Sequence, residues 1–430
     1  MSEFFRSSSA IAVVLIAALS ACDSVDPGPA FAGDAPVSDP VALRSPAGPG
    51  SGEPSLYTTA DGRVHMSWIE PDGAGHAIRF ATLGADGWTS PRTIADSATF
   101  FVNWADFPSI IELADGALAA HWLQRRPGAD SPYAYDVVIS LSADGGEHWQ
   151  PGLTPHRDGT AAEHGFVSML PETDGGLTVV WLDGRNAAIA EPRPAGPGPD
   201  MTLRSAHVSG SGDITQEALL DPRICDCCQT SATFVGDTLL VAYRDRSAEE
   251  IRDIYTVRRD AQGWHKPVRV AQDNWMIPGC PVNGPAIAAL EDAGAVAWFS
   301  LVGGAPEVKV AFTDNQGRSF GEPLLLERAE GDWATLGRVD AEWIDAEKVL
   351  VTWLAAKGKR AEIRYRTASR SGELGPVRVL AETNPSRSSG FPRITRAGSD
   401  LIFAWTLPGE PATIKMARLT LAAVPLPALR

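Results

Sequence analysis

Seven copies of one pattern occupy the chain from residue 40 onward. Each copy has a short β-like segment, a turn that contains Gly or Asp, and a strand that ends in an aromatic residue. These residues, spaced 52 to 62 positions apart, are Trp68, Trp122, Trp181, Tyr243, Trp298, Trp353 and Trp405. A repeat of about 50 residues with several strands per unit is typical of β-propeller blades. The sequence therefore predicts an all-β propeller, most simply of seven four-stranded blades, with six as the alternative.

The seventh repeat lacks one strand at its C-terminal end. Its strands are expected at residues 392–395, 401–406 and 413–420, and no clear outer strand follows. The segment 40–43 (Pro-Val-Ala-Leu) resembles the expected outer strand of the sixth repeat at 376–379 (Pro-Val-Arg-Val). We therefore expect an N-terminal strand to complete the last blade, because closing the ring removes exposed sheet edges.

Two turns carry a further motif. Residues 142–149 read Ser-Ala-Asp-Gly-Gly-Glu-His-Trp, and residues 313–320 are a softened copy, Thr-Asp-Asn-Gln-Gly-Arg-Ser-Phe. They resemble the Asp-box, or BNR repeat, of sialidase-like propellers, and the resemblance extends over the whole repeat region. The box is a turn device in which a polar side chain accepts backbone hydrogen bonds and Gly takes the turn conformation. The residues interpreted as structural are Ser142, Asp144, Gly146, Trp149, Thr313, Asn315, Gly317 and Phe320.

The N-terminus has the features of a targeting segment. Arg6 precedes an apolar run at 11–19, which is short for a membrane span and typical of a signal peptide. The run ends in Leu-Ser-Ala-Cys, which resembles the lipobox of bacterial lipoproteins and implies cleavage before a lipidated Cys22. An ordinary signal peptide with an incidental cysteine is the alternative.

This interpretation divides the chain into three parts. Residues 1–21 form the signal peptide, 22–38 the lipidated cysteine with a flexible tether, and 39–430 the propeller. We expect the protein in the bacterial cell envelope, held by its lipid in the inner or outer membrane. The propeller then lies in the periplasm or at the cell surface.

The charge balance excludes one class of partner. The 430 residues carry a formal net charge of -16 at pH 7, with 53 Asp and Glu against 37 Lys and Arg. Phosphate binding needs a basic face, and this acidic field opposes it. We expect no nucleic-acid partner.

One face of the propeller gathers the charged loops. The connection into each inner strand and the connection between second and third strands share a face, opposite the Asp-box turns. Guanidinium groups there are suited to clamp a carboxylate, which predicts an anionic glycan or a partner protein as ligand. The alternative is a set of surface ion pairs of little energetic weight. The ligand-binding candidates are Arg185, Arg244, Asp245, Arg246, Arg252, Asp253, Arg338 and Arg393.

Four cysteines remain once Cys22 is set aside: Cys225, Cys227, Cys228 and Cys280. In an exported protein they predict two disulfides, whose pairing the sequence leaves open. The alternative is a thiolate site for copper(I) or zinc, with His164 as a further ligand. No other cofactor is predicted.

The resemblance to sialidases also raises the question of catalysis. That family uses three arginines, an Asp acid/base and a Tyr nucleophile paired with a Glu. Asp106 and Glu163 are the catalytic candidates here, but the one late tyrosine, Tyr365, is expected inside a third strand. We therefore predict a binding propeller first, with an exo-sialidase or other glycoside hydrolase as the alternative and a metal-binding or redox protein as the second alternative.

Overall fold

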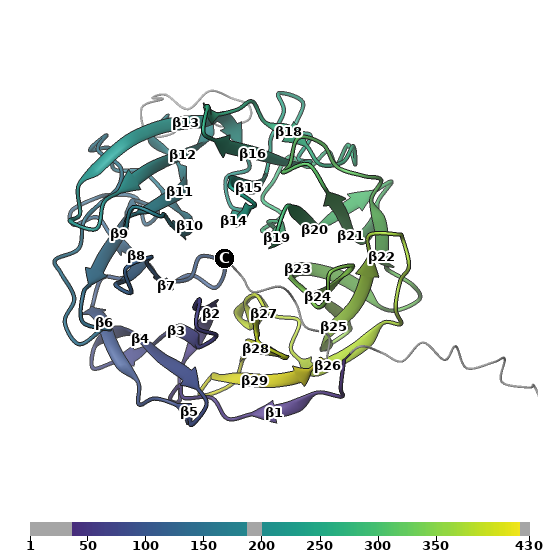
Figure 1. The fold of residues 1–430 in the computed structure, drawn as a ribbon, viewed down its shortest axis with the longest axis horizontal. Helices are drawn as coiled ribbons and strands as arrows, with labels where there is room; N and C mark the ends of the chain where they lie inside the picture. The colour runs from purple at the N-terminus through teal and green to yellow at the C-terminus, as the bar shows by residue number, and fades with distance from the viewer. Residues whose placement is uncertain (1–36, 187–199, 422–430) are drawn as a thin grey trace, which may run out of the picture. The chain divides into compact units, whose positions relative to one another are not determined.

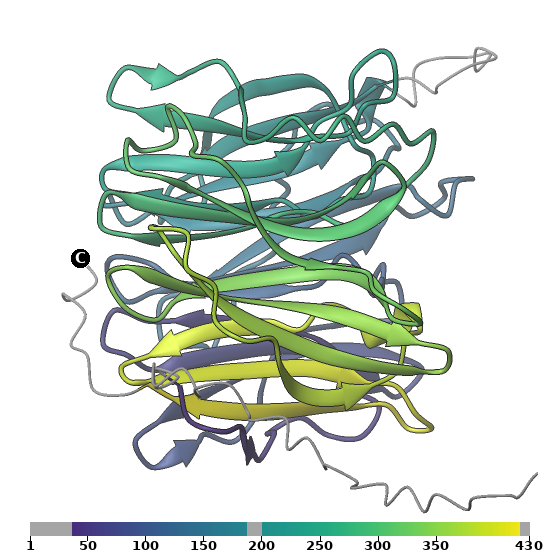
Figure 2. The ribbon, with the colours of Figure 1, turned by 90° about the vertical axis from the view of Figure 1, so that its right-hand side faces the viewer.

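Seven β-sheets surround one central axis (Figure 1). The computed structural model describes residues 37–186 and 200–421, all within the unit Pro36–Arg430. The expected signal peptide, Cys22 and most of the tether lie outside the described residues. Within this unit the strands of every blade run between the two faces of the ring (Figure 2). The prediction of an all-β propeller with seven blades is confirmed.

The blades follow the repeats of the sequence. Blade 1 contains β2 (Gly52–Thr58), β3 (Val64–Asp72), β4 (Gly75–Gly84), β5 (Gly87–Trp88) and β6 (Arg92–Ser97). Blade 2 contains β7 (Ser109–Glu112), β8 (Leu118–Arg125) and β9 (Tyr135–Ser142). Blade 3 contains β10 (His164–Pro171), β11 (Leu177–Asp183), β12 (Met201–Val208) and β13 (Ile214–Ile224). Blade 4 contains β14 (Ser231–Val235), β15 (Thr238–Arg244), β16 (Ile254–Asp260), β17 (Gly263–Trp264) and β18 (Val268–Arg269).

The second half of the ring repeats this plan. Blade 5 contains β19 (Ala286–Leu290), β20 (Ala293–Val302), β21 (Ala305–Thr313) and β22 (Leu324–Arg328). Blade 6 contains β23 (Ala334–Trp343), β24 (Lys348–Lys357), β25 (Arg360–Ser369) and β26 (Arg378–Thr383). Blade 7 contains β27 (Arg393–Ala397), β28 (Asp400–Leu407), β29 (Thr413–Thr420) and the N-terminal β1 (Val41–Leu43). A short 3-10 helix, η1 (Arg387–Ser389), precedes β27.

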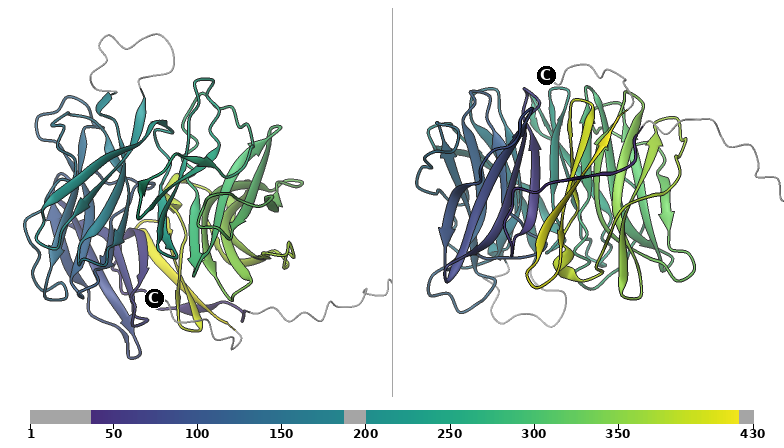
Figure 3. Two further views of the ribbon diagram at one scale, coloured as in Figure 1. Left: turned by 45° about the horizontal axis from the view of Figure 1, so that its top comes forward. Right: turned by 90° about the horizontal axis from the view of Figure 1, so that it is seen from below.

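The N-terminal strand closes the ring as predicted. β1 pairs antiparallel with β29, with Val41 opposite Arg418 and Leu43 opposite Met416. Purple β1 lies beside yellow β29 (Figure 1, Figure 3). An isolated bridge between Val37 and Leu421 extends this pairing. The two ends of the described chain therefore hold each other in one blade.

The second strand of each blade supplies much of the core. All seven residues of β11 are buried, as are all seven of β15. Such continuous burial matches the apolar runs in the sequence, because a strand covered on both faces needs no alternation of polar residues. The aromatic repeat residues lie near the ends of these strands, and Trp68, Trp181, Trp298 and Trp353 are fully buried. Each fills the space between its blade and a neighbour.

The Asp-box of blade 2 is a closed hydrogen-bonding unit. The Oδ1 atom of Asp144 accepts hydrogen bonds from the Ser142 hydroxyl and from the backbone N–H groups of Glu147 and His148, at 2.9, 3.1 and 2.9 Å. Gly146 has a φ of 86°, and a Cβ there would come within 2.3 Å of the Phe80 ring of blade 1. Trp149 contacts the same ring edge to face, with centroids 6.1 Å apart. The turn thus joins two blades as well as two strands.

In the softened copy of blade 5, Asn315 Oδ1 accepts the Ser319 N–H at 3.0 Å and the Thr313 hydroxyl at 2.9 Å. Gly317 has a φ of 75°, and Phe320 packs against the core between blades 4 and 5. The two boxes therefore share one geometry.

Among the residues that the structure describes, none belongs to a helix with the length and apolar character needed to cross a membrane.

Candidate functional site at the channel mouth

Hydrogen bonds from side chains to backbone groups connect neighbouring blades near their inner strands. Asp106 Oδ2 accepts the Phe166 N–H at 2.7 Å, and Asn283 Oδ1 accepts the Arg338 N–H at 2.7 Å. Both Phe166 and Arg338 sit at β-bulges with positive φ, 54° and 57°. A bulge leaves a backbone group without a ladder partner, so the adjacent blade supplies one. Asp106, a predicted catalytic residue, therefore also has a structural contact at the channel.

The inner strands enclose a cavity of about 190 Å³ along the channel. Among its lining residues, Asp106 and Arg393 are the two that carry a formal charge, while Phe107 and Phe391 contribute aromatic rings. Burial raises the pKa of Asp106 to about 8, against the lowering effect of the Phe166 N–H. The Asp106 carboxyl is therefore mostly protonated at neutral pH and can donate a hydrogen bond.

A row of three aromatic rings with a guanidinium group at each end extends outward from this cavity. Arg338 lies 4.7 Å above the Trp104 ring, and Trp104 is nearly parallel to Phe391 with centroids 5.9 Å apart. Phe391 in turn contacts Phe107, over which Arg393 lies at 5.3 Å. Trp104 and Phe107 are only partly buried. We call Trp104, Phe107, Arg338, Phe391 and Arg393, together with Asp106, the channel mouth.

The two arginines of the channel mouth differ in what they already bind. Arg338 is buried and donates to the carbonyl oxygens of Ser386 and Gly390 at 3.0 and 3.1 Å, and burial lowers its pKa to about 10. The Arg393 side chain is 26% exposed, and its nearest acidic atom is Asp340 Oδ2 at 3.3 Å. Arg393 therefore has donors available to a ligand, whereas Arg338 mainly holds the loop around η1.

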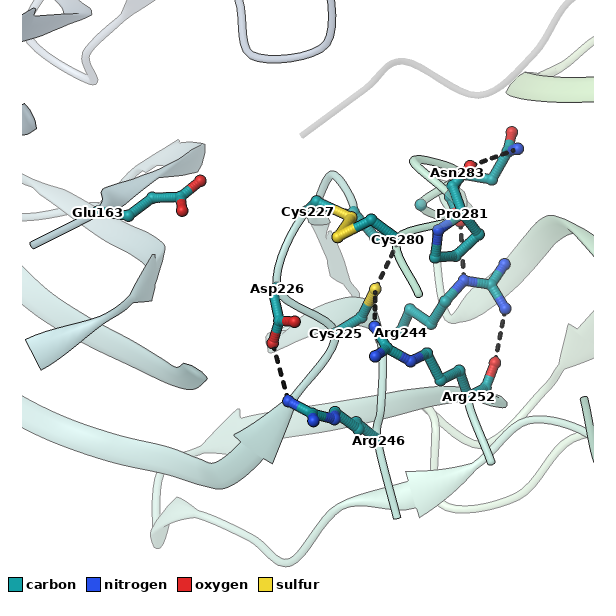
Figure 4. The surroundings of a disulfide bond; sticks show 12 residues. Glu163, Cys225, Asp226, Cys227, Arg244, Arg246, Arg252, Cys280, Pro281 and Asn283 are labelled. Atoms are coloured by element: carbon teal, nitrogen blue, oxygen red, sulfur yellow. Dashed lines mark hydrogen bonds and ion pairs between the residues drawn. A yellow bond between two sulfur atoms is a disulfide. The ribbon is translucent and has the colours of Figure 1, made fainter. Parts of the chain in front are cut away.

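The arginines of blade 4 use their donors inside the protein (Figure 4). Arg244 donates to the carbonyl oxygens of Asn283, Arg252 and Phe299 at 2.9, 2.6 and 2.6 Å. Arg246 contacts Glu250 and Asp226 at 2.8 and 3.2 Å. The Arg252 guanidinium lies 2.9 Å from Glu250 and 3.3 Å from the Cys225 sulfur. These three buried side chains brace the cysteine loop.

Two of the other ligand-binding candidates, Arg185 and Asp253, also have partners within the protein, and Asp245 is partly buried. Arg185 binds Asp183 through two hydrogen bonds of 2.8 and 2.7 Å. Asp253 accepts the N–H groups of Asn274 and Trp275 at 3.2 Å each. Burial raises the pKa of Asp245 to about 7. Of the eight candidates, Arg393 alone borders the channel cavity among the described residues.

One of the two expected disulfides is present, and it joins Cys227 to Cys280 (Figure 4). Cys225 and Cys228 are buried thiols whose sulfur atoms lie 2.9 Å apart. Burial opposes ionisation of Cys225, but the Cys228 thiol and the Arg252 charge lower its pKa to about 7. His164, considered with the cysteines, instead stacks against His156.

A tyrosine that the sequence reasoning missed lies beside both catalytic candidates. The Tyr135 hydroxyl donates to Glu163 Oε1 at 2.8 Å, and the Glu163 charge contributes to raising the pKa of Asp106. Burial raises the pKa of Glu163 to about 7. Tyr135 is fully buried and stacks on Phe101 at 3.9 Å. The one feature of the sequence that could have pointed to Tyr135 was its position at the start of a third strand, on the face that carries Glu163.

Comparison with known proteins identifies the fold but no family. No protein-family model matches the sequence. No curated protein matches it either. Similar solved structures include a PL25 ulvan lyase, with a TM-score of 0.55, 11% identity and coverage of 89% of this chain and 96% of that one. The polysaccharide lyase Uly1 has a TM-score of 0.50, 8% identity and coverage of 86% and 90%. The NanB sialidase of Streptococcus pneumoniae has a TM-score of 0.41, 13% identity and coverage of 86% and 68%. The two polysaccharide lyases thus share the propeller fold of this chain.

Proposed function

We propose that this chain is an envelope lipoprotein whose propeller binds an acidic glycan at the channel mouth. The observation that carries the proposal is the row of three aromatic rings beside the channel cavity, with the partly exposed Arg393 guanidinium at the end that borders the cavity. The lipobox-like sequence before Cys22 supports the anchor.

The chemistry of the channel mouth suits an acidic sugar. Trp104 and Phe107 offer aromatic surface for the apolar face of a sugar ring. Arg393 supplies a charge-assisted hydrogen bond to a carboxylate or sulfate. Asp106, with its pKa raised to about 8, does not repel such an anion at neutral pH. The ulvan lyase that shares the fold has also been solved bound to -[GlcA(1-4)Rha3S]-.

A glycoside hydrolase is the second candidate, because Tyr135, Glu163 and Asp106 lie together. A tyrosine paired with a glutamate is the nucleophile arrangement of sialidases. The 2.8 Å hydrogen bond between Tyr135 and Glu163 provides that pair. Tyr135 has no exposed surface, however, so binding is the function that this geometry supports better.

Calorimetric titration of the purified propeller with a polyuronate, a sulfated polysaccharide and a neutral glucan tests the proposal. We expect the acidic polymers to bind. The Arg393→Ala substitution should weaken their binding at least about tenfold, since a hydrogen bond to a charged group contributes about 1.5–3 kcal/mol. Arg360→Ala is the matched control, because that side chain is 69% exposed and pairs only with exposed Glu382.

Equal affinity of wild type and Arg393→Ala for the acidic polymers would show that Arg393 does not bind the anionic group of the glycan. Turnover of an aryl sialoside or another glycoside by wild type, lost in Tyr135→Phe, would replace binding with hydrolysis as the function.

A further inference from the structure

Two buried thiols lie against a disulfide where the chain enters blade 4. A turn at residues 226–227 brings Cys225 and Cys228 together, and their sulfur atoms lie 2.9 Å apart. The sulfur of Cys227, from the same turn, lies within 4.8 Å of both. Cys227 is bonded to Cys280, which precedes blade 5 (Figure 4). We call these four residues the cysteine cluster, and the channel mouth uses none of them.

The members of the cysteine cluster differ in their access to solvent. Cys280 is exposed and Cys227 is half-buried, whereas Cys225 and Cys228 are 1% and 2% exposed. A reagent in solvent therefore meets Cys280 first. The buried thiols are shielded from that reagent, but the sulfur of Cys227 lies within their reach.

Cys225 has the surroundings of a reactive thiolate. Arg252 Nη1 lies 3.3 Å from its sulfur, and the Cys228 thiol and the backbone N–H of Cys227 also contact it. The thiolate is the nucleophile in disulfide chemistry, and a neighbouring cation favours it, whereas apolar burial makes a thiol inert. Burial opposes ionisation of Cys225, but these contacts lower its pKa to about 7. Burial and the neighbouring Cys225 raise the pKa of Cys228 well above its ordinary value.

We propose that the two buried thiols exchange with the Cys227–Cys280 disulfide, so that the cysteine cluster holds its one disulfide at either of two positions. In the first step the Cys225 thiolate attacks the Cys227 sulfur. A Cys225–Cys227 bond forms, the bond to Cys280 breaks, and the electron pair leaves on Cys280, which takes up a proton from solvent.

In the second step Cys228 attacks the Cys225 sulfur. A Cys225–Cys228 bond forms, and the electron pair leaves on Cys227, which takes the proton that Cys228 gives up. One disulfide and two thiols are present before and after the two steps. The exchange therefore needs no external oxidant or reductant.

The spacing of the cysteines favours this order of steps. Attack of Cys228 on the adjacent Cys227 would form a strained disulfide between neighbouring residues. Cys225 and Cys228 are instead the first and fourth residues of a turn, whose Cα atoms lie within about 7 Å, close to the upper limit that a disulfide spans. Cys228 already lies 2.9 Å from the sulfur that it must attack.

The exchange changes how two blades are connected. The Cys227–Cys280 bond joins the connection into blade 4 to the connection into blade 5, whereas a Cys225–Cys228 bond lies within the first of these alone. The second connection also carries Asn283, whose Oδ1 accepts the backbone N–H of Arg338. Exchange thus releases a segment next to the channel mouth and leaves an exposed Cys280 thiol. This inference does not depend on the glycan that the channel mouth binds.

Peptide mapping of untagged, exported protein tests the exchange. Trypsin releases the peptides 224–244, which holds three of the cysteines, and 270–309, which holds Cys280. These peptides stay linked while the Cys227–Cys280 bond is intact. Iodoacetamide, added to the folded protein without reductant, alkylates a released Cys280 thiol and traps the exchanged state. We expect wild type to lose the link over time and to gain a disulfide within peptide 224–244.

Two variants separate the steps, and both keep the Cys227–Cys280 disulfide. Cys225→Ser removes the nucleophile, so we expect its peptides to stay linked for as long as wild type needs to lose the link. Cys228→Ser allows the first step only, so Cys280 should become alkylated while Cys225 stays bonded to Cys227. The variants make the same chemical change three residues apart, and each is the matched control for the other.

Three outcomes would overturn the proposal. A link that persists in folded wild type, although the denatured chain shows two free thiols, would make Cys225 and Cys228 inert core residues. Absence of any free thiol in wild type as isolated would mean that both pairs are permanent disulfides. Equal rates of link loss in wild type and Cys225→Ser would mean that the disulfide is opened from solvent.

Discussion

At the scale of single residues, burial decides what the acidic groups of the channel do. Asp106 is close to fully buried and forms no ion pair with a cationic side chain in the described part of the chain, so its folded-state pKa rises to about 8 from an ordinary value near 4. Burial likewise raises the pKa of Glu163 and the pKa of Glu53 to about 7. Nothing in the sequence around these residues distinguishes them from the exposed acids that give the chain its negative charge.

The raised pKa of Asp106 predicts a pH-dependent stability. Between about pH 4 and 8 the folded state keeps a proton that the unfolded state has lost, so the free energy of unfolding falls as pH rises, by up to about 1.4 kcal/mol per pH unit. The stabilisation is complete below the unfolded pKa and is lost through the folded pKa of about 8. The Asp106→Asn variant keeps an oxygen that can accept the Phe166 N–H. It has no carboxyl group to titrate, so it loses this dependence of the free energy of unfolding on pH.

Urea unfolding of wild type and Asp106→Asn at several pH values between 5 and 8 measures the difference. Glu53 titrates in both proteins and cancels, whereas Glu163 interacts with Asp106, so the comparison measures Asp106 together with its effect on Glu163. Exposed Asp314→Asn serves as the control, because its side chain is 67% exposed. Parallel pH profiles for wild type and Asp106→Asn would show that Asp106 is ionised in the folded state.

At the scale of elements, the Asp-box turn requires glycine for two separable reasons. Gly145 and Gly146 both have positive φ, 70° and 86°. A Cβ at Gly145 meets nothing within 4 Å, whereas one at Gly146 would clash with Phe80 of the neighbouring blade. The pair therefore distinguishes backbone strain from inter-blade packing.

We predict that Gly145→Ala costs about 1–2 kcal/mol of stability through the left-handed backbone alone. Gly146→Ala should cost about 1–3 kcal/mol more, because the added methyl overpacks the contact with Phe80. Chemical denaturation of the two variants gives the comparison. Equal losses would mean that Phe80 moves aside at no cost and that the turn does not couple the blades.

At the scale of the whole molecule, ring closure depends on a three-residue strand. β1 covers the outer edge of β29, and without it blade 7 would present an unpaired strand to solvent. The paired strands β1 and β29 are therefore separated by most of the sequence.

Removal of residues 37–46 should lower the melting temperature by at least about 2 °C and promote self-association through the exposed β29 edge. Differential scanning calorimetry and sedimentation velocity measure both effects, with a chain that begins at residue 37 as the reference. A truncated chain that stays monomeric with an unchanged melting temperature would show that β1 contributes nothing to closure.

The sequence by itself determined the architecture, because a propeller is built from local units. Each repeat encodes its own strands, turns and aromatic core residue, so the period of Trp68, Trp122 and their successors was enough to predict seven blades and the closing strand. The same locality makes each Asp-box turn recognisable from one short stretch of residues, because its hydrogen bonds join near neighbours in the chain.

The tertiary structure alone decided which polar residues border the channel cavity. The sequence placed Arg244 and Arg393 on one face, but only packing showed that three backbone carbonyls saturate Arg244 while Arg393 borders the cavity. The Tyr135–Glu163 pair and the stacked histidines likewise join residues that no sequence motif connects. Periodicity specifies which residues enter strands, whereas a site depends on distances between side chains of different blades, and these arise only when the ring closes.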